Sequence, residues 1–215
     1  SITHELKTPL SAIKLGIQTL QKRQGLSPEQ REPLERSALA NTERLHSLID
    51  NVLLATRIES GQHPLYFNPT NLSEKTNQIC QETEIALGKS GMIDREIELG
   101  LTINIDGNAY ESILVNLIEN AFKYGDNQNI DVSLRKEGSR MLLTVEDQGQ
   151  GIPLQERKKI FDKFYRMGNE ETRSKKGTGL GLFIVKELVA LHHGKITISE
   201  GASGGALFTV LLPPS

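Results

Sequence analysis

The sequence predicts an α+β chain in which an antiparallel helical hairpin precedes an α/β domain. Apolar side chains in the first sixty residues recur at helical spacing, and all ten aromatic residues lie at Tyr66 or later. Beyond that point strand patterns and helix patterns alternate, which is typical of helices packed on a mixed sheet. Ten of the 19 glycines follow Asp147, where the backbone must therefore bend sharply or approach a ligand.

The composition of the 215 residues is that of a soluble globular protein. With 25 basic and 27 acidic side chains, the net charge of -2 gives no electrostatic footprint for nucleic acid or an anionic membrane surface. The single cysteine, Cys80, excludes an internal disulfide and a cysteine-based zinc site. No apolar run approaches the ~18 residues of a membrane span. Because the chain starts inside a helical pattern without an initiator methionine, we expect a fragment of a longer protein.

Two helices are predicted before residue 60, each with one apolar face. Gly25 can end the first helix, and Ser27-Pro28-Glu29 is typical of an N-cap followed by proline at the first helical position. The first face contains Ile2, Leu6, Leu10, Ile13, Ile17 and Leu20, and the second contains Leu34, Ala38, Asn41, Leu45, Leu48, Val52, Ala55 and Ile58.

Two helices cannot enclose a core alone, because each covers the apolar face of the other only partly. We therefore expect a homodimer in which two hairpins form a four-helix bundle. Gly61 and Pro64 indicate a linker after the second helix. The expected organisation is a hairpin at 1–61, a linker at 62–66 and an α/β domain at 67–215.

The α/β domain is predicted to contain helices at 108–124 and 180–191. Two neighbouring strands are expected on either side of a turn at 137–139. The predicted strands cover 97–105, 130–136, 141–146, 195–199 and 206–212.

Two glycine clusters of this domain are candidate ligand loops. Asp147 is an acceptor-only carboxylate at a strand end, able to accept from an exocyclic amine, and Gly149 and Gly151 let the backbone approach a flat ligand. An ordinary strand turn explains this motif alone about equally well. The second cluster, 177–181, opens a helix, where amides without nearby Cβ atoms favour phosphate binding over a merely flexible loop. Residues 154–176 between the clusters have the composition of a mobile lid with an apolar anchor at 160–166.

Three polar side chains share one face of the helix at 108–124: Asn116, Asn120 and Lys123. An asparagine oxygen is a reasonable ligand for Mg²⁺ that bridges phosphates, and Lys123 is a reasonable phosphate partner. A solvated polar stripe remains an alternative, more for the lysine than for the asparagines, because the rest of the helix is apolar.

Two other motifs fail. Gly88-Lys89-Ser90 resembles the end of a phosphate loop, but Thr83 occupies the position of the required glycine and the setting predicts a helix. The adjacent His192 and His193 point in different directions, so we interpret them as helix-end residues stabilised by the helix dipole rather than as metal ligands.

His4 lies beside Glu5 on the first helix, off the apolar face. A lone exposed histidine is usually a simple polar residue. Here a neighbouring carboxylate can accept its proton, Thr8 offers a hydroxyl one turn on, and Pro9 removes a backbone donor near Glu5. A neutral imidazole in this setting is available as a nucleophile.

Five segments together resemble the conserved boxes of sensor histidine kinases of two-component systems. The resemblance covers essentially the whole chain, in the family's order and spacing. It implies a HisKA-type dimerisation and phosphoacceptor hairpin, then a HATPase_c α/β sandwich of the gyrase, Hsp90, histidine kinase and MutL type. Lys163 departs from the family, since many members have proline at this position of the F box. The departure affects the geometry expected of the lid and leaves the family assignment unchanged. The boxes are 4–9 (H), 116–123 (N), 147–151 (G1), 161–164 (F) and 177–181 (G2).

The resemblance also implies roles. His4 would accept the phosphoryl group, Glu5 would be the assisting base, and Thr8 would orient water when the partner is dephosphorylated. ATP and Mg²⁺ would be the cofactors, with Asn120 on the metal. The nucleotide contacts implied are Asn116, Asn120, Lys123 (phosphates), Tyr124, Asp147 (adenine amino group), Gly149, Gly151, Ile152, Phe164, Arg166, Gly177, Thr178, Gly179, Leu180, Gly181 and Leu182.

The implied activity is an ATP-dependent autokinase that passes its phosphoryl group to an aspartate of a response-regulator receiver domain and also dephosphorylates it. To reach His4, the ATP domain would swing on the linker. The chain would be the cytoplasmic core of a membrane-anchored sensor. A simple ATPase would instead need a hydrolytic carboxylate where Asn116 stands and no reactive histidine. A non-catalytic docking module is the third alternative, and the intact boxes argue against it.

Overall fold

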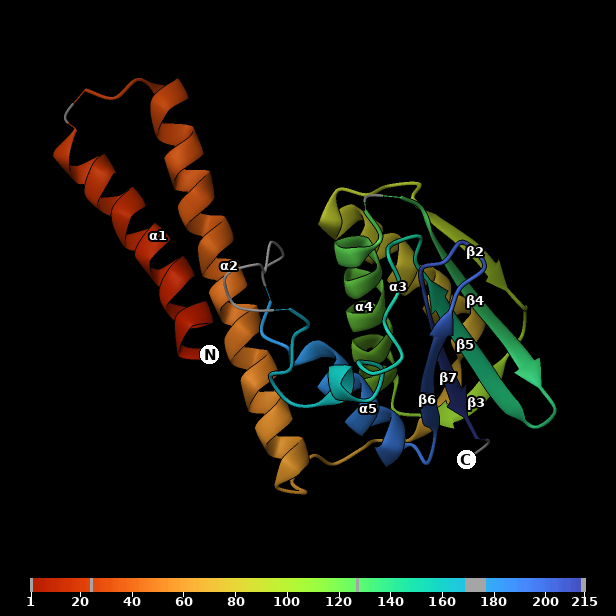
Figure 1. Ribbon diagram of the computed structural model, residues 1–215. Helices are drawn as coiled ribbons and strands as arrows, with labels where there is room; N and C mark the ends of the chain where they lie inside the picture. The colour runs from red at the N-terminus through yellow and green to blue at the C-terminus, as the bar shows by residue number, and fades with distance from the viewer. Residues whose placement is uncertain (1, 24, 127, 169–176, 214–215) are drawn as a thin grey trace.

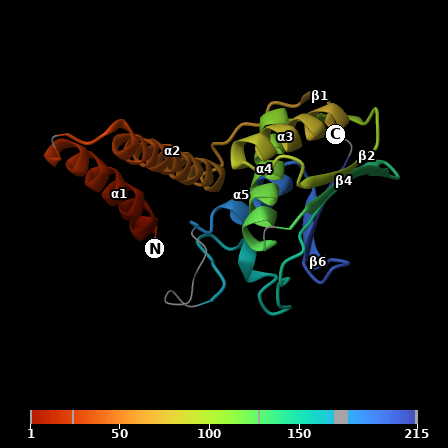
Figure 2. The ribbon, with the colours of Figure 1, turned by 90° about the horizontal axis from the view of Figure 1, so that it is seen from above.

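The computed structural model describes residues 2–23, 25–126, 128–168 and 177–213. A long helical hairpin stands beside a layered α/β domain (Figures 1 and 2). The elements in chain order are α1 (Ile2–Lys22), α2 (Pro28–Glu59), β1 (Asn68–Asn71), α3 (Leu72–Leu87), β2 (Ile93–Ile97), β3 (Thr102–Ile105), α4 (Gly107–Tyr124), β4 (Ile130–Glu137), β5 (Arg140–Glu146), the 3₁₀ turn η1 (Lys159–Phe161), α5 (Gly181–Leu191), β6 (Lys195–Glu200) and β7 (Ala206–Leu212).

The hairpin has the predicted helices and the predicted cap. Gly25 has a φ of 97°, a backbone region that glycine tolerates best, and it lies in the connection between the helices. Pro28 begins α2, and the Gln30 side chain accepts a hydrogen bond from the backbone N–H of Ser27 at 3.3 Å. None of the described helices is long and apolar enough to cross a membrane.

The main sheet has the order β2-β4-β5-β7-β6 and is mixed, as predicted: β2 and β4 are parallel and the other pairs are antiparallel. The continuous strand predicted at 97–105 is wrong. β2 begins already at Ile93 and stops at Ile97, and β3 pairs with β1 in a separate two-stranded sheet. Gly100, at a φ of 73°, turns the chain between them.

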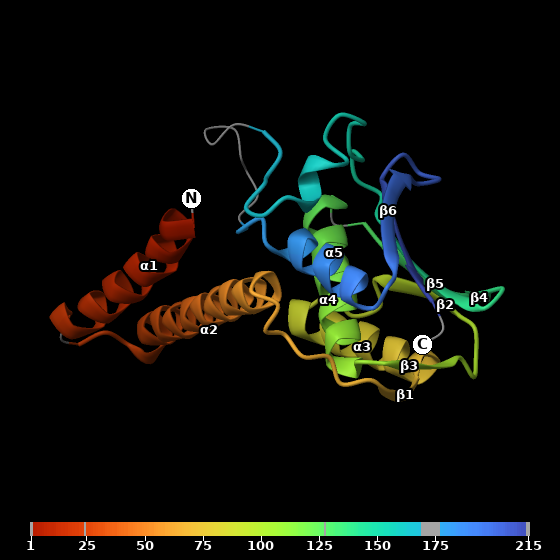
Figure 3. The same cartoon turned by 90° about the horizontal axis from the view of Figure 1, so that it is seen from below.

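Helices α3, α4 and α5 pack on one side of the main sheet (Figure 3). Asp106 caps α4 by accepting from the backbone N–H groups of Asn108 and Ala109 at 2.9 and 3.0 Å. The apolar face of α4 is buried against the sheet, and its fully buried members are Ile113, Leu114, Leu117 and Ile118. The polar residues of α4 are thereby directed to the side of the domain where the glycine loops lie.

The end of α2 packs against the α/β domain. Ala55 is fully buried and Ile58 nearly so, and both belong to the hydrophobic core that also contains α5 residues such as Phe183. Figure 3 shows α5 on the side of the domain that faces α2. The hairpin and the domain are therefore in contact, whereas the domain boundaries expected at 61 and 67 stay predictions.

Candidate functional site

Asp147 follows β5 directly and is 3% exposed. Its Oδ1 accepts hydrogen bonds from the backbone N–H groups of Gly149 at 2.9 Å and Ala206 at 3.1 Å. Burial raises the pKa of Asp147 from its ordinary value, and these two hydrogen bonds oppose the increase. The carboxylate is therefore fixed in place at the base of the G1 loop.

The G1 loop is wedged between the end of α4 and the turn that joins β6 to β7. A Cβ on Gly149 would collide with the carbonyl oxygen of Tyr124. A Cβ on Gly151 would lie 2.7 Å from the carbonyl oxygen of Gly204, and its φ is 66°. Both positions require glycine for space, which an ordinary solvated turn does not explain.

The three polar side chains of α4 line one side of the helix and face the G2 segment. A Cβ on Gly181 would lie 2.6 Å from Oδ1 of Asn116 and 3.7 Å from Nδ2 of Asn120, while one on Gly177 would collide with Nζ of Lys123. Because Nδ2 of Asn116 donates to the carbonyl of Ser112 at 2.8 Å, the Asn116 oxygen is directed toward the G2 segment.

A backbone hydrogen bond joins the F box to the G2 segment. The backbone N–H of Phe164 donates to the carbonyl of Gly179 at 3.0 Å, and Phe164 has a φ of 65°, unusual for an aromatic residue. The Thr178 hydroxyl accepts from the N–H of Leu180 at 3.3 Å. Residues 169–176 of the predicted lid lie outside the described residues.

The apolar residues of the lid and the glycine loops anchor them in the core. Ile160 and Phe161 are buried, as expected of an anchor. The Leu180 side chain is fully buried, so only its backbone is left to contact a ligand. Ile152 and Leu182 are partly buried and pack against the same core.

His4 is exposed on α1. The Thr8 hydroxyl donates to the His4 carbonyl at 3.1 Å. The Glu5 carboxylate is only 15% exposed: its Oε1 accepts from Arg166 at 2.9 Å and its Oε2 from Arg44 at 3.4 Å. The sequence predicts that the domain must swing to reach His4, yet Arg166 of that domain already contacts the neighbouring residue.

A second ion pair joins the domain to the hairpin, between Lys163 and Glu59 at the end of α2. Nζ of Lys163 also lies 5.3 Å from the ring centre of Phe164 and 5.9 Å from that of Phe183. Sequence reasoning missed Glu59 and Arg44, because no local pattern relates either residue to a partner 104 or 39 positions away.

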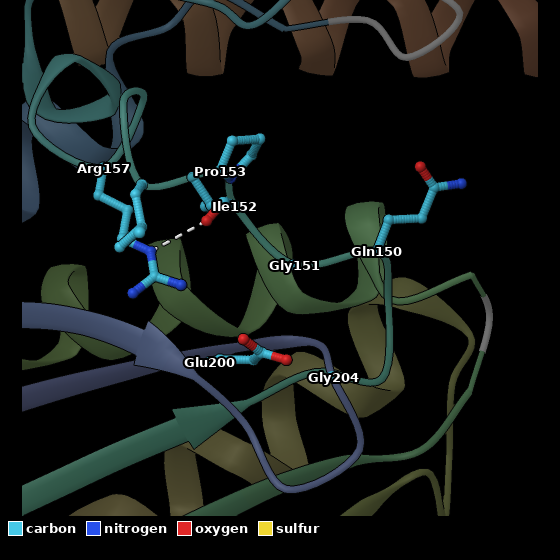
Figure 4. A pocket seen from close by; sticks show the side chains of 8 residues that line it. Gln150, Gly151, Ile152, Pro153, Arg157, Glu200 and Gly204 are labelled. Atoms are coloured by element: carbon cyan, nitrogen blue, oxygen red, sulfur yellow. Dashed lines mark hydrogen bonds between the residues drawn. The ribbon is translucent and has the colours of Figure 1, made fainter.

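A cavity of about 280 Å³ lies between the end of the G1 loop, Arg157 and the turn after β6 (Figure 4). Arg157 borders it and donates from Nε to the carbonyl of Ile152 at 2.9 Å, with Glu200 facing it from β6. Its lining does not include Asp147 or the polar face of α4. Two of the predicted contacts, Gly151 and Ile152, do line this cavity. We place the candidate site instead beside Asp147 and the polar face of α4, which the G1 and G2 glycines approach closely.

His192 is the C-cap of α5, as the sequence predicts, but the structure shows a buried ring and not an exposed helix-end residue. The ring is buried, it hydrogen-bonds through Nδ1 to the carbonyl of Leu188 at 2.7 Å, and Nε2 lies 3.4 Å from the backbone nitrogen of Asp106. Burial lowers the pKa of His192, so the neutral ring is favoured. The His192 ring thus packs at the end of α5, where it makes an edge contact with the Phe67 ring.

Two protein families match the chain. Residues 105–215 match the histidine kinase-, DNA gyrase B- and HSP90-like ATPase family, and residues 1–61 match the His Kinase A phosphoacceptor domain. The sensor histidine kinase TmoS of Ectopseudomonas mendocina is 36% identical over 99% of this chain, which spans 22% of the length of TmoS.

Solved structures share the arrangement of both regions. The Acinetobacter baumannii histidine kinase AdeS superposes with a TM-score of 0.76 over 98% of this chain and 97% of AdeS; at 21% identity this shows the fold. Full-length ShkA, solved with AMPPNP, superposes with a TM-score of 0.73 at 26% identity over 98% of this chain and 44% of ShkA. The chain thus belongs to the histidine kinase-, DNA gyrase B- and HSP90-like ATPase family, as a two-component histidine kinase core with an ATP-binding domain and a phosphoacceptor hairpin.

Proposed function

We propose that this chain transfers the γ-phosphoryl group of ATP to His4 and then to an aspartate of a response-regulator receiver domain. The observation that carries the proposal is the 2.9 Å ion pair between Arg166 and Glu5. It connects the lid of the ATP-binding domain to the residue beside an exposed histidine. A domain that only hydrolysed ATP would not need this contact.

The buried Asp147 supports recognition of adenine. A carboxylate accepts several hydrogen bonds, so the exocyclic amine of adenine can donate to Asp147 alongside Gly149 and Ala206. The ammonium of Lys123 and the backbone amides at the start of α5 would neutralise the phosphates. Most of the stabilisation of the transferred group would come from these charges.

The side chains of α4 fit a magnesium ion that arrives with the substrate phosphates. Mg²⁺ is usually held by one or two protein oxygens together with phosphates and water. Asn120 is partly buried and its side chain lies near Gly181 at the start of α5; we assign its amide oxygen as the ligand. Across the described ranges, no cluster of three His, Cys, Asp or Glu side chains would hold a metal alone. The ion would supply charge neutralisation at the phosphates.

In the transfer, a ring nitrogen of His4 attacks the γ-phosphorus in line with the leaving oxygen of ADP. The nitrogen–phosphorus bond forms as the phosphorus–oxygen bond breaks, and ADP leaves with the electron pair. Glu5 accepts the proton from the other ring nitrogen. Asn116 favours this transfer over hydrolysis, because an amide cannot take a proton from water as a carboxylate does.

We also propose that two hairpins form a homodimer. Leu10, Leu15, Leu39 and Leu53 are each more than half exposed on the hairpin, at 56, 66, 61 and 52%. A second copy would cover them in a four-helix bundle. Sedimentation equilibrium of the intact chain tests this, and a monomer at micromolar concentration would contradict it.

The receiver domain would dock on the hairpin near His4, and the Thr8 hydroxyl would orient water when the phosphorylated receiver is dephosphorylated. Thr8→Ala should slow dephosphorylation and leave autophosphorylation intact. We place this core on the cytoplasmic side of a longer, membrane-anchored sensor.

Incubation with γ-labelled ATP and Mg²⁺ tests the proposed activity. We expect protein-bound label that is lost in acid and kept in base. The label should be absent in His4→Ala and present in His46→Ala, which removes another exposed histidine of the hairpin. Free phosphate without labelled protein would indicate a simple ATPase instead.

A further inference from the structure

A dimer of this chain holds two copies of His4, and either copy could receive the phosphoryl group. The contacts between the ATP-binding domain and the hairpin bear on this choice, because they bring the lid of the domain against the residue beside His4 of the same chain. Arg166 reaches Glu5 on α1, and Lys163 reaches Glu59 at the end of α2. Lys163 and Arg166, three positions apart on the lid, therefore form ion pairs with both helices of the hairpin of the same chain.

The ion pairs are accompanied by apolar burial. Ala55 is fully buried and Ile58 is 8% exposed, and both pack in the same hydrophobic cluster as residues of the ATP-binding domain. These residues precede Glu59 on the face of α2 that contacts α5. The domain is thus anchored at the end of its own α2 by packing as well as by charge.

The linker is also fastened. The backbone N–H of Tyr66 donates to Oδ2 of Asp106 at 2.7 Å, and Gly61 donates to the carbonyl of Ile58 at 3.0 Å. These bonds shorten the free tether between α2 and β1. A domain that left its own hairpin for that of a second copy would expose Ala55 and Ile58 and break both ion pairs.

Resting on the proposed function, we propose that autophosphorylation is intramolecular: the nucleotide bound by one chain phosphorylates His4 of the same chain. Arg166 would exchange its partner from Glu5 to the nucleotide phosphates. This exchange frees Glu5 to accept the proton of His4, while Arg44 still holds the carboxylate from α2. The pair between Lys163 and Glu59 touches neither reacting group and keeps the domain on its own hairpin.

Mixed dimers test which histidine is phosphorylated. One chain carries His4→Ala with an intact ATP site; the other carries Asp147→Asn with an intact His4, and two affinity tags isolate the mixed dimer. We expect no label on either chain after incubation with γ-labelled ATP. Label on the Asp147→Asn chain would overturn the proposal. Mixed dimers of each variant with the wild-type chain are the controls, and in both the wild-type chain should be labelled.

Cross-linking gives a readout that does not depend on activity, so failure of the kinase assay and failure of this proposal are distinguishable. Lys163→Cys and Glu59→Cys in one chain, treated with a short bifunctional maleimide, should give a cross-linked monomer. The same two substitutions placed on different chains of a dimer should give no covalent dimer. A covalent dimer in the second experiment would overturn the proposal. The single variants control for Cys80, which is buried.

Discussion

Replacing Gly149 by alanine tests how tightly the loop around Asp147 is held. The added Cβ would collide with the carbonyl oxygen of Tyr124, a backbone atom that cannot rotate away. The loop would have to shift by about 1 Å, a displacement large enough to matter at a binding site. The shift would stretch the 2.9 Å hydrogen bond from the Gly149 N–H to Asp147.

The size of the effect follows from that bond. A hydrogen bond to a charged group contributes about 1.5–3 kcal/mol, and about 1.4 kcal/mol corresponds to a tenfold change in an equilibrium constant. We therefore expect Gly149→Ala to weaken ATP binding by about 10- to 150-fold, because Asp147 would no longer be fixed where adenine needs it.

Isothermal titration calorimetry with an ATP analogue measures the affinity. Gly107→Ala is the matched control, since a Cβ there would lie 3.4 Å from Cε of Lys75, the end of a flexible side chain. We expect this control to bind normally and to gain up to about 1 kcal/mol of stability. Equal affinities of Gly149→Ala and the wild type would refute the reasoning.

Three further outcomes are expected. Asp147→Asn should bind ATP weakly and yet unfold at a higher temperature than the wild type at pH 8, because the substitution removes a buried carboxylate. This gain in unfolding temperature should shrink as the pH falls through the raised pKa of Asp147, because the wild-type carboxylate is then protonated. Lys163→Glu should weaken docking of the ATP-binding domain on the hairpin by up to about 1 kcal/mol, since the ion pair between Lys163 and Glu59 is partly exposed. Adding Glu59→Lys should restore the docking, and energy transfer between dyes on the hairpin and the domain measures both effects. The lowered pKa of His192 contributes stability that is lost as the pH falls below 6.5, so the unfolding temperature of His192→Phe should depend less on acid than that of the wild type.

Local patterns were sufficient for the hairpin and for most of the sheet. The spacing of apolar residues located α1 and α2, and Ser27 with Pro28 located the start of α2. The pattern failed at 97–105, because alternation of residues does not reveal which sheet a strand joins or where Gly100 turns the chain. Strand pairing is decided by contacts with β1 and β4, which are distant in sequence.

The glycine loops and the polar face of α4 were also visible as motifs, since their function constrains residue types over short spans. The contacts between the two regions were not visible. The pair of Glu5 with Arg166 joins residues 161 positions apart, and each residue alone is an ordinary surface charge. The burial of His192 was not visible for a related reason: it depends on contacts with Asp106 and Phe67, which are distant in sequence and which periodicity does not report.

Transfer of phosphate from a nucleotide beside Asp147 to His4 is the central claim, and peptide mapping by mass spectrometry tests it most directly. The chain is incubated with ATP and Mg²⁺, kept at alkaline pH, digested and mapped. The phosphoryl group should be found on the peptide that contains His4, and the Asp147→Asn variant should carry none. Modification of another residue, or turnover of ATP with an unmodified His4 peptide, would contradict the claim.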